Sequence, residues 1–336
     1  MVVLKLIEEL LSNPSYYKLK DFTFESGEVL KDLQVEYITL GEADYDSKGN
    51  IQNAILYCHG SSGDFGSIKR IKDLISENSL LTYKKYFFIC LSGLGSPKSS
   101  APSTTNLKSD FPNYSITDMA NFQIVFLKEK FNINHLKGII GNSMGGFIAL
   151  TLASKYPDYI DFVISLVSSY KVAGHNYAAS KIMNDIILSD PDYNNGKYTK
   201  PLRKALKLAS KTMYTLGLSR EYYHSLSNKE IDEGIEELSS EGSLDDANDV
   251  VYINNACHYY DIEDELKNIE VPVFIVAINQ DQYFPPELDA IPMSKKIKNS
   301  TMAIYDSELG HIGSSDILNV EKELKEFLSG VDSNEC

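Results

Sequence analysis

Short apolar runs recur along the chain, separated by segments in which apolar residues recur every three or four positions. Five runs with almost no charged side chain have the length of strands buried on both faces, and they occupy residues 54–58, 86–91, 136–140, 162–167 and 271–278. Helical periodicity fills 116–131 and 144–155 between them. Because strands and helices alternate, the pattern predicts an α/β protein with a mostly parallel, doubly wound sheet covered by helices on both faces.

The N-terminal part predicts two further elements. Residues 1–11 are apolar but are interrupted by Lys5, Glu8 and Glu9 at helical spacing, which is typical of an amphipathic helix packed on the body and not of a signal peptide. Residues 22–39 contain two extended stretches around Gly27, which predicts an antiparallel hairpin at the edge of the sheet. No run reaches transmembrane length, so we expect no membrane partner.

The alternation of strands and helices stops near Ser169 and resumes near Val271. Roughly a hundred residues between these points carry mostly helical signal, which is too long for a plain loop. We therefore predict a core formed by residues 1–169 and 263–336, with residues 170–262 inserted as a helical cap. Within this cap, residues 230–249 hold nine acidic side chains and no Lys or Arg. Blocks of like charge usually face solvent, so we interpret this segment as an exposed face and not as a cation site.

Charge narrows the class of partner. The 336 residues include 32 Lys or Arg and 47 Asp or Glu, and the resulting net charge of −15 repels phosphate backbones and anionic membranes. We therefore expect neither nucleic acid nor a membrane as partner. Only Arg70, Arg203 and Arg220 are arginines, so few side chains can hold a carboxylate or a phosphate through two hydrogen bonds.

The four cysteines are far apart in sequence and form no CxxC pair; they are Cys58, Cys90, Cys257 and Cys336. This spacing suggests neither a disulfide framework nor a zinc site, so we expect no bound metal. A reducing compartment fits best, and we expect the protein in the cytoplasm.

The most informative motif is Gly141-Asn142-Ser143-Met144-Gly145, which matches G-x-S-x-G between an apolar strand and a helix. The turn of such a nucleophile elbow is so sharp that only small residues fit two positions before and after the serine. It lifts the Ser143 hydroxyl clear of the sheet at a helix N-terminus, where backbone N–H groups favour negative charge. We predict that Ser143 is a nucleophile; the alternative is a glycine-rich turn that contains a serine by chance.

A second group of hydrogen-bond donors is expected after the run 54–58, where the sequence reads His59-Gly60-Ser61-Ser62-Gly63. Gly60 allows a tight turn, so the N–H groups of Ser61 and Met144 can point at one oxygen and form an oxyanion hole. An ordinary glycine turn is the alternative. We expect His59 to be structural, because it lies at the strand end below the site.

An α/β-hydrolase triad follows the chain order serine, acid, histidine. Asp281 follows the run 271–278, and His311 is the only histidine after it. Asp306 and Glu308 are the rival acids, but they stand too close to His311 in sequence to reach it from a different strand end. We predict an α/β-hydrolase fold in which Asp281 orients His311 and His311 acts as the base.

Over nearly its whole length the chain resembles the homoserine O-acetyltransferase family of α/β-hydrolase proteins. The motifs that carry the resemblance are Phe24-Glu25-Ser26-Gly27, Asn53-Ala54-Ile55-Leu56, residues 141–146, Asp190-Pro191-Asp192-Tyr193, Gly196-Lys197-Tyr198, Asp281 with Phe284-Pro285-Pro286, and Gly310-His311. The resemblance implies a ping-pong reaction in which an acyl-CoA acylates Ser143 and the acyl group then passes to a hydroxyl acceptor. It implies acyl-CoA as a co-substrate, no further cofactor, and a homodimer formed through the cap.

Three departures from the family pattern favour hydrolysis of a small ester. The family usually continues after its catalytic histidine with an aspartate and an apolar pair, whereas here His311-Ile312-Gly313-Ser314-Ser315 follows. Residues 93–103 lack the family's Gly-Pro signature and look more like the hydrolase branch. The family binds the acceptor's carboxylate with a cap arginine, for which only Arg203 and Arg220 are available. We therefore predict an esterase-type serine hydrolase; the alternatives are an O-acyltransferase that uses an acyl-CoA and a non-catalytic binding protein of the same fold.

Overall fold

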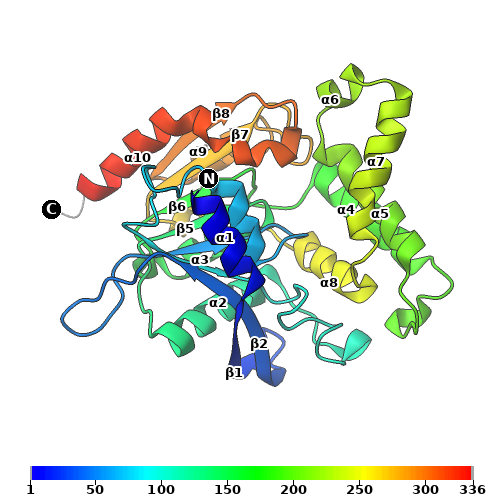
Figure 1. Ribbon diagram of the computed structural model, residues 1–336, viewed down its shortest axis with the longest axis horizontal. Coiled ribbons are helices and arrows are strands. Elements are labelled where there is room, and N and C mark those ends of the chain that lie inside the picture. Colours follow the sequence, from blue (N-terminus) through cyan, green and yellow to red (C-terminus); the bar gives the residue numbers. More distant parts are fainter. Residues whose placement is uncertain (1, 334–336) are drawn as a thin grey trace.

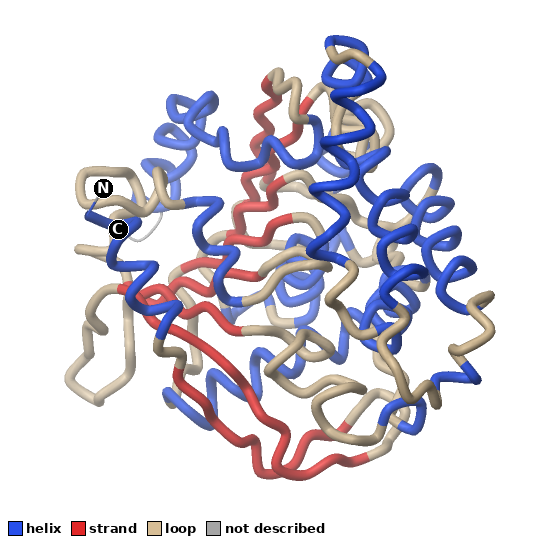
Figure 2. The backbone as a smooth tube through the Cα atoms, turned by 45° about the vertical axis from the view of Figure 1, so that its right-hand side comes forward, coloured by secondary structure: helices blue, strands red, loops and turns tan. Residues whose placement is uncertain are grey.

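An eight-stranded sheet crosses the centre of the computed structural model, which describes residues 2–333 (Figures 1 and 2). Its strand order is β1-β2-β4-β3-β5-β6-β7-β8. Strand β2 pairs antiparallel with β1 and with β4, and all other pairings are parallel. The predicted α/β fold, with a mostly parallel sheet and an antiparallel edge hairpin, is confirmed.

The strands are β1 (Ser15–Thr23), β2 (Val29–Leu40), β3 (Ala54–Cys58), β4 (Phe87–Leu91), β5 (Gly138–Asn142), β6 (Val163–Leu166), β7 (Val273–Ile278) and β8 (Ser300–Tyr305). The α-helices are α1 (Val2–Ser12), α2 (Ile116–Phe131), α3 (Met144–Lys155), α4 (Gly174–Leu188), α5 (Arg203–Gly217), α6 (Arg220–Ser225), α7 (Asn228–Gly242), α8 (Ala247–His258), α9 (Ala290–Lys296) and α10 (Glu321–Ser333). Two longer 3₁₀ segments, Phe65–Ile71 and Gly310–Val320, follow β3 and β8.

Helices cover both faces of the sheet. Successive strand residues point to opposite sides, so Leu56 and Ile139 pack with α2 and α3 on one face, whereas Ile55 and Ile140 pack with α1 and α10 on the other. All four side chains are completely buried. The central strands are apolar at nearly every position because neither of their faces meets water.

The first strand begins earlier than predicted, at Ser15 instead of near residue 22. In β1 only Leu19 and Phe22 are buried, because this strand lies at the edge of the sheet. Its alternation of apolar and polar residues is therefore too weak to recognise from sequence.

Strand β5 is displaced by two residues from the predicted range 136–140. Gly141 and Asn142 pair with Ser165 and Leu166 of β6, so the strand continues up to the residue before Ser143. Glycine and asparagine have low strand propensity, but pairing within the sheet overrides this preference.

Between β6 and β7 every described α-helix belongs to one group, α4 to α8, which lies beside the sheet in Figure 1. We call residues 170–262 the cap. An antiparallel bridge between Lys171 and Asp261 joins its two ends. Helix α8 links the cap to the core, because Val251 packs in the apolar cluster of the cap whereas Ile253 packs in that of the core.

No helix among residues 2–333 is long and apolar enough to cross a bilayer. Cys58, Cys90 and Cys257 are buried and free, whereas Cys336 lies outside the described residues.

Candidate active site

Ser143 lies at the turn between β5 and α3. Its backbone has φ 54° and ψ −121°, a conformation that residues with a side chain rarely adopt, and its N–H donates to the Leu166 carbonyl of β6 over 2.9 Å. This is the conformation that the G-x-S-x-G motif predicts for a serine at a strand-to-helix turn.

The two flanking glycines permit close contact between α3 and the neighbouring strands. A Cβ atom on Gly145 would lie 2.0 Å from the Cys58 carbonyl oxygen at the end of β3. A Cβ atom on Gly141 would lie 2.2 Å from the Gly145 carbonyl oxygen. Both distances are far below van der Waals contact, so any larger residue would push the start of α3 away from the sheet.

His311 reaches Ser143 from the 3₁₀ segment that follows β8. Its Nε2 atom lies 2.9 Å from Ser143 Oγ, and its Nδ1 atom lies 2.8 Å from Asp281 Oδ2. The preceding Gly310 has φ 59°, and a Cβ atom there would approach the Ser219 backbone nitrogen to 2.9 Å. Glycine is therefore the residue that lets the chain present His311 at this point.

Asp281 follows β7 and is only 3% exposed. Its Oδ1 atom accepts hydrogen bonds from the N–H groups of Tyr283 (2.8 Å) and Phe284 (3.1 Å), which fixes the carboxylate. The rings of Tyr283 and Phe284 also contact the imidazole of His311 in edge-to-face fashion. A carboxylate at Nδ1 favours the tautomer that leaves Nε2 free to accept a proton from Ser143.

The rival acids are exposed and point elsewhere. Asp306 accepts hydrogen bonds from the side chains of Asn279 (2.9 Å) and Gln280 (3.0 Å). The backbone carbonyl of Glu308 accepts a hydrogen bond from Ser219. Of the three acids, only Asp281 bonds to His311.

The proposed oxyanion-hole residues lie beside the nucleophile. Ser61 and Met144 line the same cavity as Ser143 and His311. Met144 is the first residue of α3, so its N–H has no partner within the helix. A Cβ atom on Gly60 would lie 3.5 Å from the Cβ of Ser143, so the loop after β3 comes directly against the elbow.

His59 is buried below this loop. Its Nε2 atom accepts a hydrogen bond from the Gly93 N–H over 2.9 Å, and its Nδ1 atom lies 2.7 Å from the Gly60 carbonyl oxygen. Burial lowers the pKa of its imidazole. A neutral His59 therefore holds two loops together, which agrees with the structural role expected for it.

The triad opens into a cavity of about 270 Å³ between the core and the cap. The core contributes Ser143 and His311, while the cap contributes Met183 of α4, Tyr214 of α5 and Asn254 of α8. A substrate in this cavity would contact both parts of the chain.

Neither Arg203 nor Arg220 lines the triad cavity. Arg203 borders a separate hollow, and Arg220 is exposed at the start of α6 beside Glu221. The arginine at the triad cavity is Arg70, from the first 3₁₀ segment of the core, whose Nη1 atom lies 3.5 Å from the Ile312 carbonyl oxygen. The sequence signal that could have identified Arg70 as a site residue is its position soon after the glycine loop at residues 60–63.

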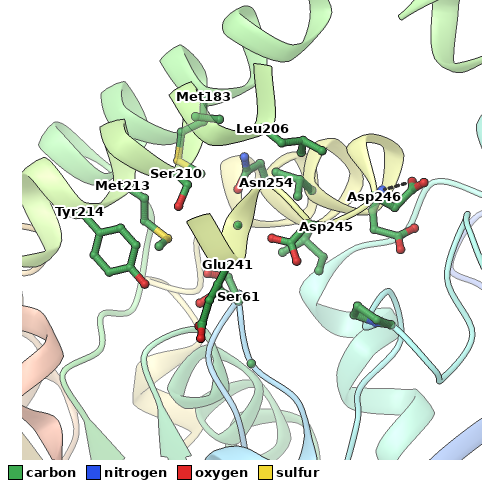
Figure 3. Close-up of a pocket in the computed structure, with 18 residues that line it drawn as sticks. Ser61, Met183, Leu206, Ser210, Met213, Tyr214, Glu241, Asp245, Asp246 and Asn254 are labelled. Atoms are coloured by element: carbon green, nitrogen blue, oxygen red, sulfur yellow. Dashed lines mark hydrogen bonds between the residues drawn. The ribbon is translucent and has the colours of Figure 1, made fainter. Parts of the chain in front are cut away.

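A second cavity, of about 230 Å³, adjoins the first and is lined by four acidic side chains, Glu241, Asp245, Asp246 and Asp249 (Figure 3). Burial, with a smaller contribution from neighbouring carboxylates, raises the pKa of Asp249 to about 7 and that of Asp245 to about 6. The interpretation of residues 230–249 as a solvated face holds for the acidic side chains from Glu230 to Asp245, which are exposed, whereas Asp246 is half-buried and the interpretation is wrong for Asp249, which is buried.

Sequence comparison places the chain among acyl-transfer proteins. The family model described as "alpha/beta hydrolase fold" matches residues 53–313. A probable acyltransferase from Methanothermobacter thermautotrophicus is 46% identical, over 94% of this chain and 98% of that protein. A homoserine O-acetyltransferase from Methanohalobium evestigatum is 27% identical, over 88% of this chain and 69% of that protein.

Structural comparison supports the same fold. The acetyl esterase MekB superposes with a TM-score of 0.85 at 23% identity, covering 96% of this chain and 98% of that structure. A homoserine O-acetyltransferase from Bacillus anthracis superposes with a TM-score of 0.83 at 24% identity, covering 94% and 97%. Esterases and acyltransferases therefore share this architecture, cap included.

Proposed function

The chain belongs to the α/β-hydrolase fold family as a homoserine O-acetyltransferase-like enzyme, and from that premise we propose that it transfers an acyl group through an ester on Ser143. The observation that carries the proposal is the continuous chain of hydrogen bonds from Asp281 through His311 to Ser143.

The first half-reaction forms the acyl-enzyme. His311 Nε2 takes the proton of Ser143 Oγ while the oxygen attacks the carbonyl carbon of the acyl donor. The N–H groups of Ser61 and Met144 hold the negative oxygen of the tetrahedral intermediate. His311 then gives the proton to the leaving thiol or alcohol, which departs and leaves the acyl group on Ser143. Asp281 stays ionised and stabilises the imidazolium.

In the second half-reaction an acceptor hydroxyl attacks the acyl-enzyme, and His311 takes its proton and returns it to Ser143. We propose an alcohol as the acceptor, which makes the enzyme an O-acyltransferase. The relative with 46% identity, a probable acyltransferase, supports this assignment. The cap residues over Ser143 support it too, because a covered acyl-enzyme lasts longer against water.

Hydrolysis of a small ester is the second candidate. It is favoured by the loop His311-Ile312-Gly313, in which the aspartate that usually follows the histidine in the acetyltransferase family is absent. Both candidates share the acyl-enzyme and differ in whether water or an alcohol attacks it.

A labelling experiment tests the acyl-enzyme. A fluorophosphonate probe should label the wild type and not Ser143→Ala, whereas Ser240→Ala, which changes an exposed serine on α7, should be labelled like the wild type. Equal labelling of Ser143→Ala would refute the triad assignment. The acyl-enzyme formed from acetyl-CoA or p-nitrophenyl acetate is then offered homoserine and other alcohols. A new acetyl ester identifies a transferase, and acetate alone identifies a hydrolase.

The assembly is a further part of the proposal. We propose a homodimer formed through the cap, supported by the exposed apolar side chains of Ile182 and Leu188 on α4 and Leu208 on α5. Light scattering should give twice the mass of one chain. Replacing Ile182 and Leu208 with serine should then halve that mass.

The state of the cysteines supports a proposal about the cellular compartment. Three buried, free cysteines fit a reducing environment, so we propose the cytoplasm. Cell fractionation tests this assignment.

A further inference from the structure

The cavity that adjoins the triad carries an unusual concentration of negative charge. We call this cavity of about 230 Å³, with its four carboxylates at Glu241, Asp245, Asp246 and Asp249, the acidic chamber. The carboxylates come from the end of α7, the following loop and the start of α8. No Lys, Arg or His is among its lining residues.

Two of the four carboxylates have their own partners. Asp246 caps α8 and accepts a hydrogen bond from the Tyr198 hydroxyl over 2.5 Å. Asp249 accepts from the N–H (2.9 Å) and the hydroxyl (2.5 Å) of Ser103. These contacts hold the two side chains in the wall of the chamber.

The other two carboxylates have no such partner. Within residues 2–333, neither Glu241 nor Asp245 makes a side-chain hydrogen bond or an ion pair. Both line the cavity (Figure 3). Both residues also reach solvent. Their charges add to those of Asp246 and Asp249 around one cavity, and a cavity lined by charge of one sign attracts a ligand of the opposite sign.

An independent observation also indicates a ligand. The hydroxyl oxygen of Ser210, on α5, is buried without a hydrogen-bond partner in the described chain, and the residue is 94% buried. Ser210 lines the chamber beside the end of α7, where a Cβ atom on Gly242 would lie 2.6 Å from its hydroxyl oxygen, and Figure 3 shows this oxygen pointing away from α5 toward the other lining residues. Buried polar groups in proteins are nearly always satisfied, so this oxygen is available to a bound molecule.

The remaining walls suit an organic cation better than a metal ion. Met183, Leu206 and Met213 are apolar, and Tyr214 supplies an aromatic ring. Among residues 2–333 no three His, Cys, Asp or Glu side chains converge as metal ligands do. The separated carboxylates can attract a positively charged nitrogen, and the apolar surface between them can contact the alkyl groups that this nitrogen carries.

The chamber connects with the reaction site, because Ser61, Tyr214 and Asn254 line both cavities. We propose that the acidic chamber binds an ammonium or quaternary ammonium group on the alcohol that reacts at Ser143. This inference rests on the acyl transfer proposed above. An acyl-CoA carries several phosphates and is repelled by the chamber, so the alcohol is the reactant that fits.

The proposal also excludes a class of acceptor. A carboxylate close to the cationic nitrogen would lie among four acidic side chains, with no basic residue in the chamber to offset them. The preferred alcohol is therefore a net cation, such as an amino alcohol, and not a free amino acid.

Acetyl transfer from p-nitrophenyl acetate to alcohols tests the proposal. The acceptors are choline and longer trimethylammonium alcohols, each paired with the neutral alcohol in which carbon replaces nitrogen. For at least one pair we expect the wild type to acetylate the charged alcohol with a kcat/KM about tenfold higher than the neutral one, a difference typical of contacts between a cation and charged or aromatic side chains. Equal kcat/KM values within every pair would overturn the proposal.

Variants of the chamber residues test whether the preference for a charged alcohol arises in the acidic chamber. Asp245→Asn should bring the charged and neutral alcohols close to equality, and Glu241→Gln and Ser210→Ala should each reduce the difference. The matched control is Glu237→Gln, which removes an exposed charge from α7 outside the chamber and should keep the full preference. A preference unchanged in all three chamber variants would place the cation elsewhere and overturn the assignment. Failure of the acyl-transfer proposal is seen separately, as p-nitrophenyl acetate turnover that survives Ser143→Ala.

Discussion

Replacing Asp249 with asparagine should make the stability of the enzyme less dependent on pH. Burial raises the pKa of this carboxyl to about 7 in the folded protein, with Asp246 and Asp245 adding to the effect and the hydrogen bonds from Ser103 opposing it. In the unfolded chain the same carboxyl has its ordinary pKa near 3.8. The amide of asparagine can still accept from the Ser103 N–H and donate to its hydroxyl, so the substitution removes the charge and keeps the contacts.

The sign follows from which state binds the proton. Between pH 4 and 7 the folded enzyme holds a proton on Asp249 that the unfolded chain has lost, so the free energy of unfolding falls as the pH rises through this window. The gap of about three pH units between the two pKa values corresponds to a loss of at most about 4 kcal/mol, complete above pH 7. Asp249→Asn has no carboxyl group at this position, so its free energy of unfolding should not fall for this reason as the pH rises.

Urea unfolding at pH 5 and pH 8, followed by circular dichroism, measures the difference. These two pH values span about two pH units of the window, so wild type should lose up to about 3 kcal/mol more than Asp249→Asn between them. Asp232→Asn, which removes an exposed charge from α7, should behave like the wild type. The same pH dependence in wild type and Asp249→Asn would refute the reasoning, and would mean that the side chain stays ionised in its hydrogen bonds to Ser103.

Three further predictions concern the reaction. Asp281→Asn should lower kcat by roughly 10⁴-fold, because the wrong imidazole tautomer is favoured, while the melting temperature stays near that of the wild type; near-normal turnover would move the role to another acid. Gly145→Ala should abolish turnover of p-nitrophenyl acetate and lower the melting temperature, since its Cβ would lie 2.0 Å from the Cys58 carbonyl oxygen; an active variant would show that α3 can shift freely. Arg70→Met should raise KM for anionic esters and leave KM for neutral esters unchanged, because Arg70 is the arginine at the triad cavity. The control Arg220→Ala, at an exposed arginine, should change neither KM. An equal effect of both substitutions would count against a substrate contact at Arg70.

The triad could be located from sequence because its constraints are local. Gly141 and Gly145 are needed for the turn around Ser143, and the buried strands on either side identify that turn. Chain order then leaves His311 as the one histidine after the predicted acid. The strands themselves were recognisable because both faces of the sheet are covered, so each run is apolar throughout.

The substrate side of the site could not be located in this way. Arg70 reaches the triad cavity because the 3₁₀ segment Phe65–Ile71 turns back toward His311, and no local pattern encodes that path. The acidic segment of the cap looks uniform in sequence, yet the side chains at 230–237 meet water whereas Asp249 is buried against Ser103. Which face of a cap helix is covered depends on the packing of distant elements, and so does the chemistry of the cavity.

The antiparallel bridge between Lys171 and Asp261 has a consequence for how such enzymes diversify. The bridge lies outside the strands of the sheet and brings the two ends of the cap together. The cap can therefore be exchanged, or change in length, without altering the strands themselves. Ser143 lies before the segment, and Asp281 and His311 lie after it. Recombination at the bridge can therefore exchange the part of the cavity lining that the cap supplies and keep all three triad residues. Under the proposed function, evolution can thus change the acceptor while the chemistry at Ser143 stays the same.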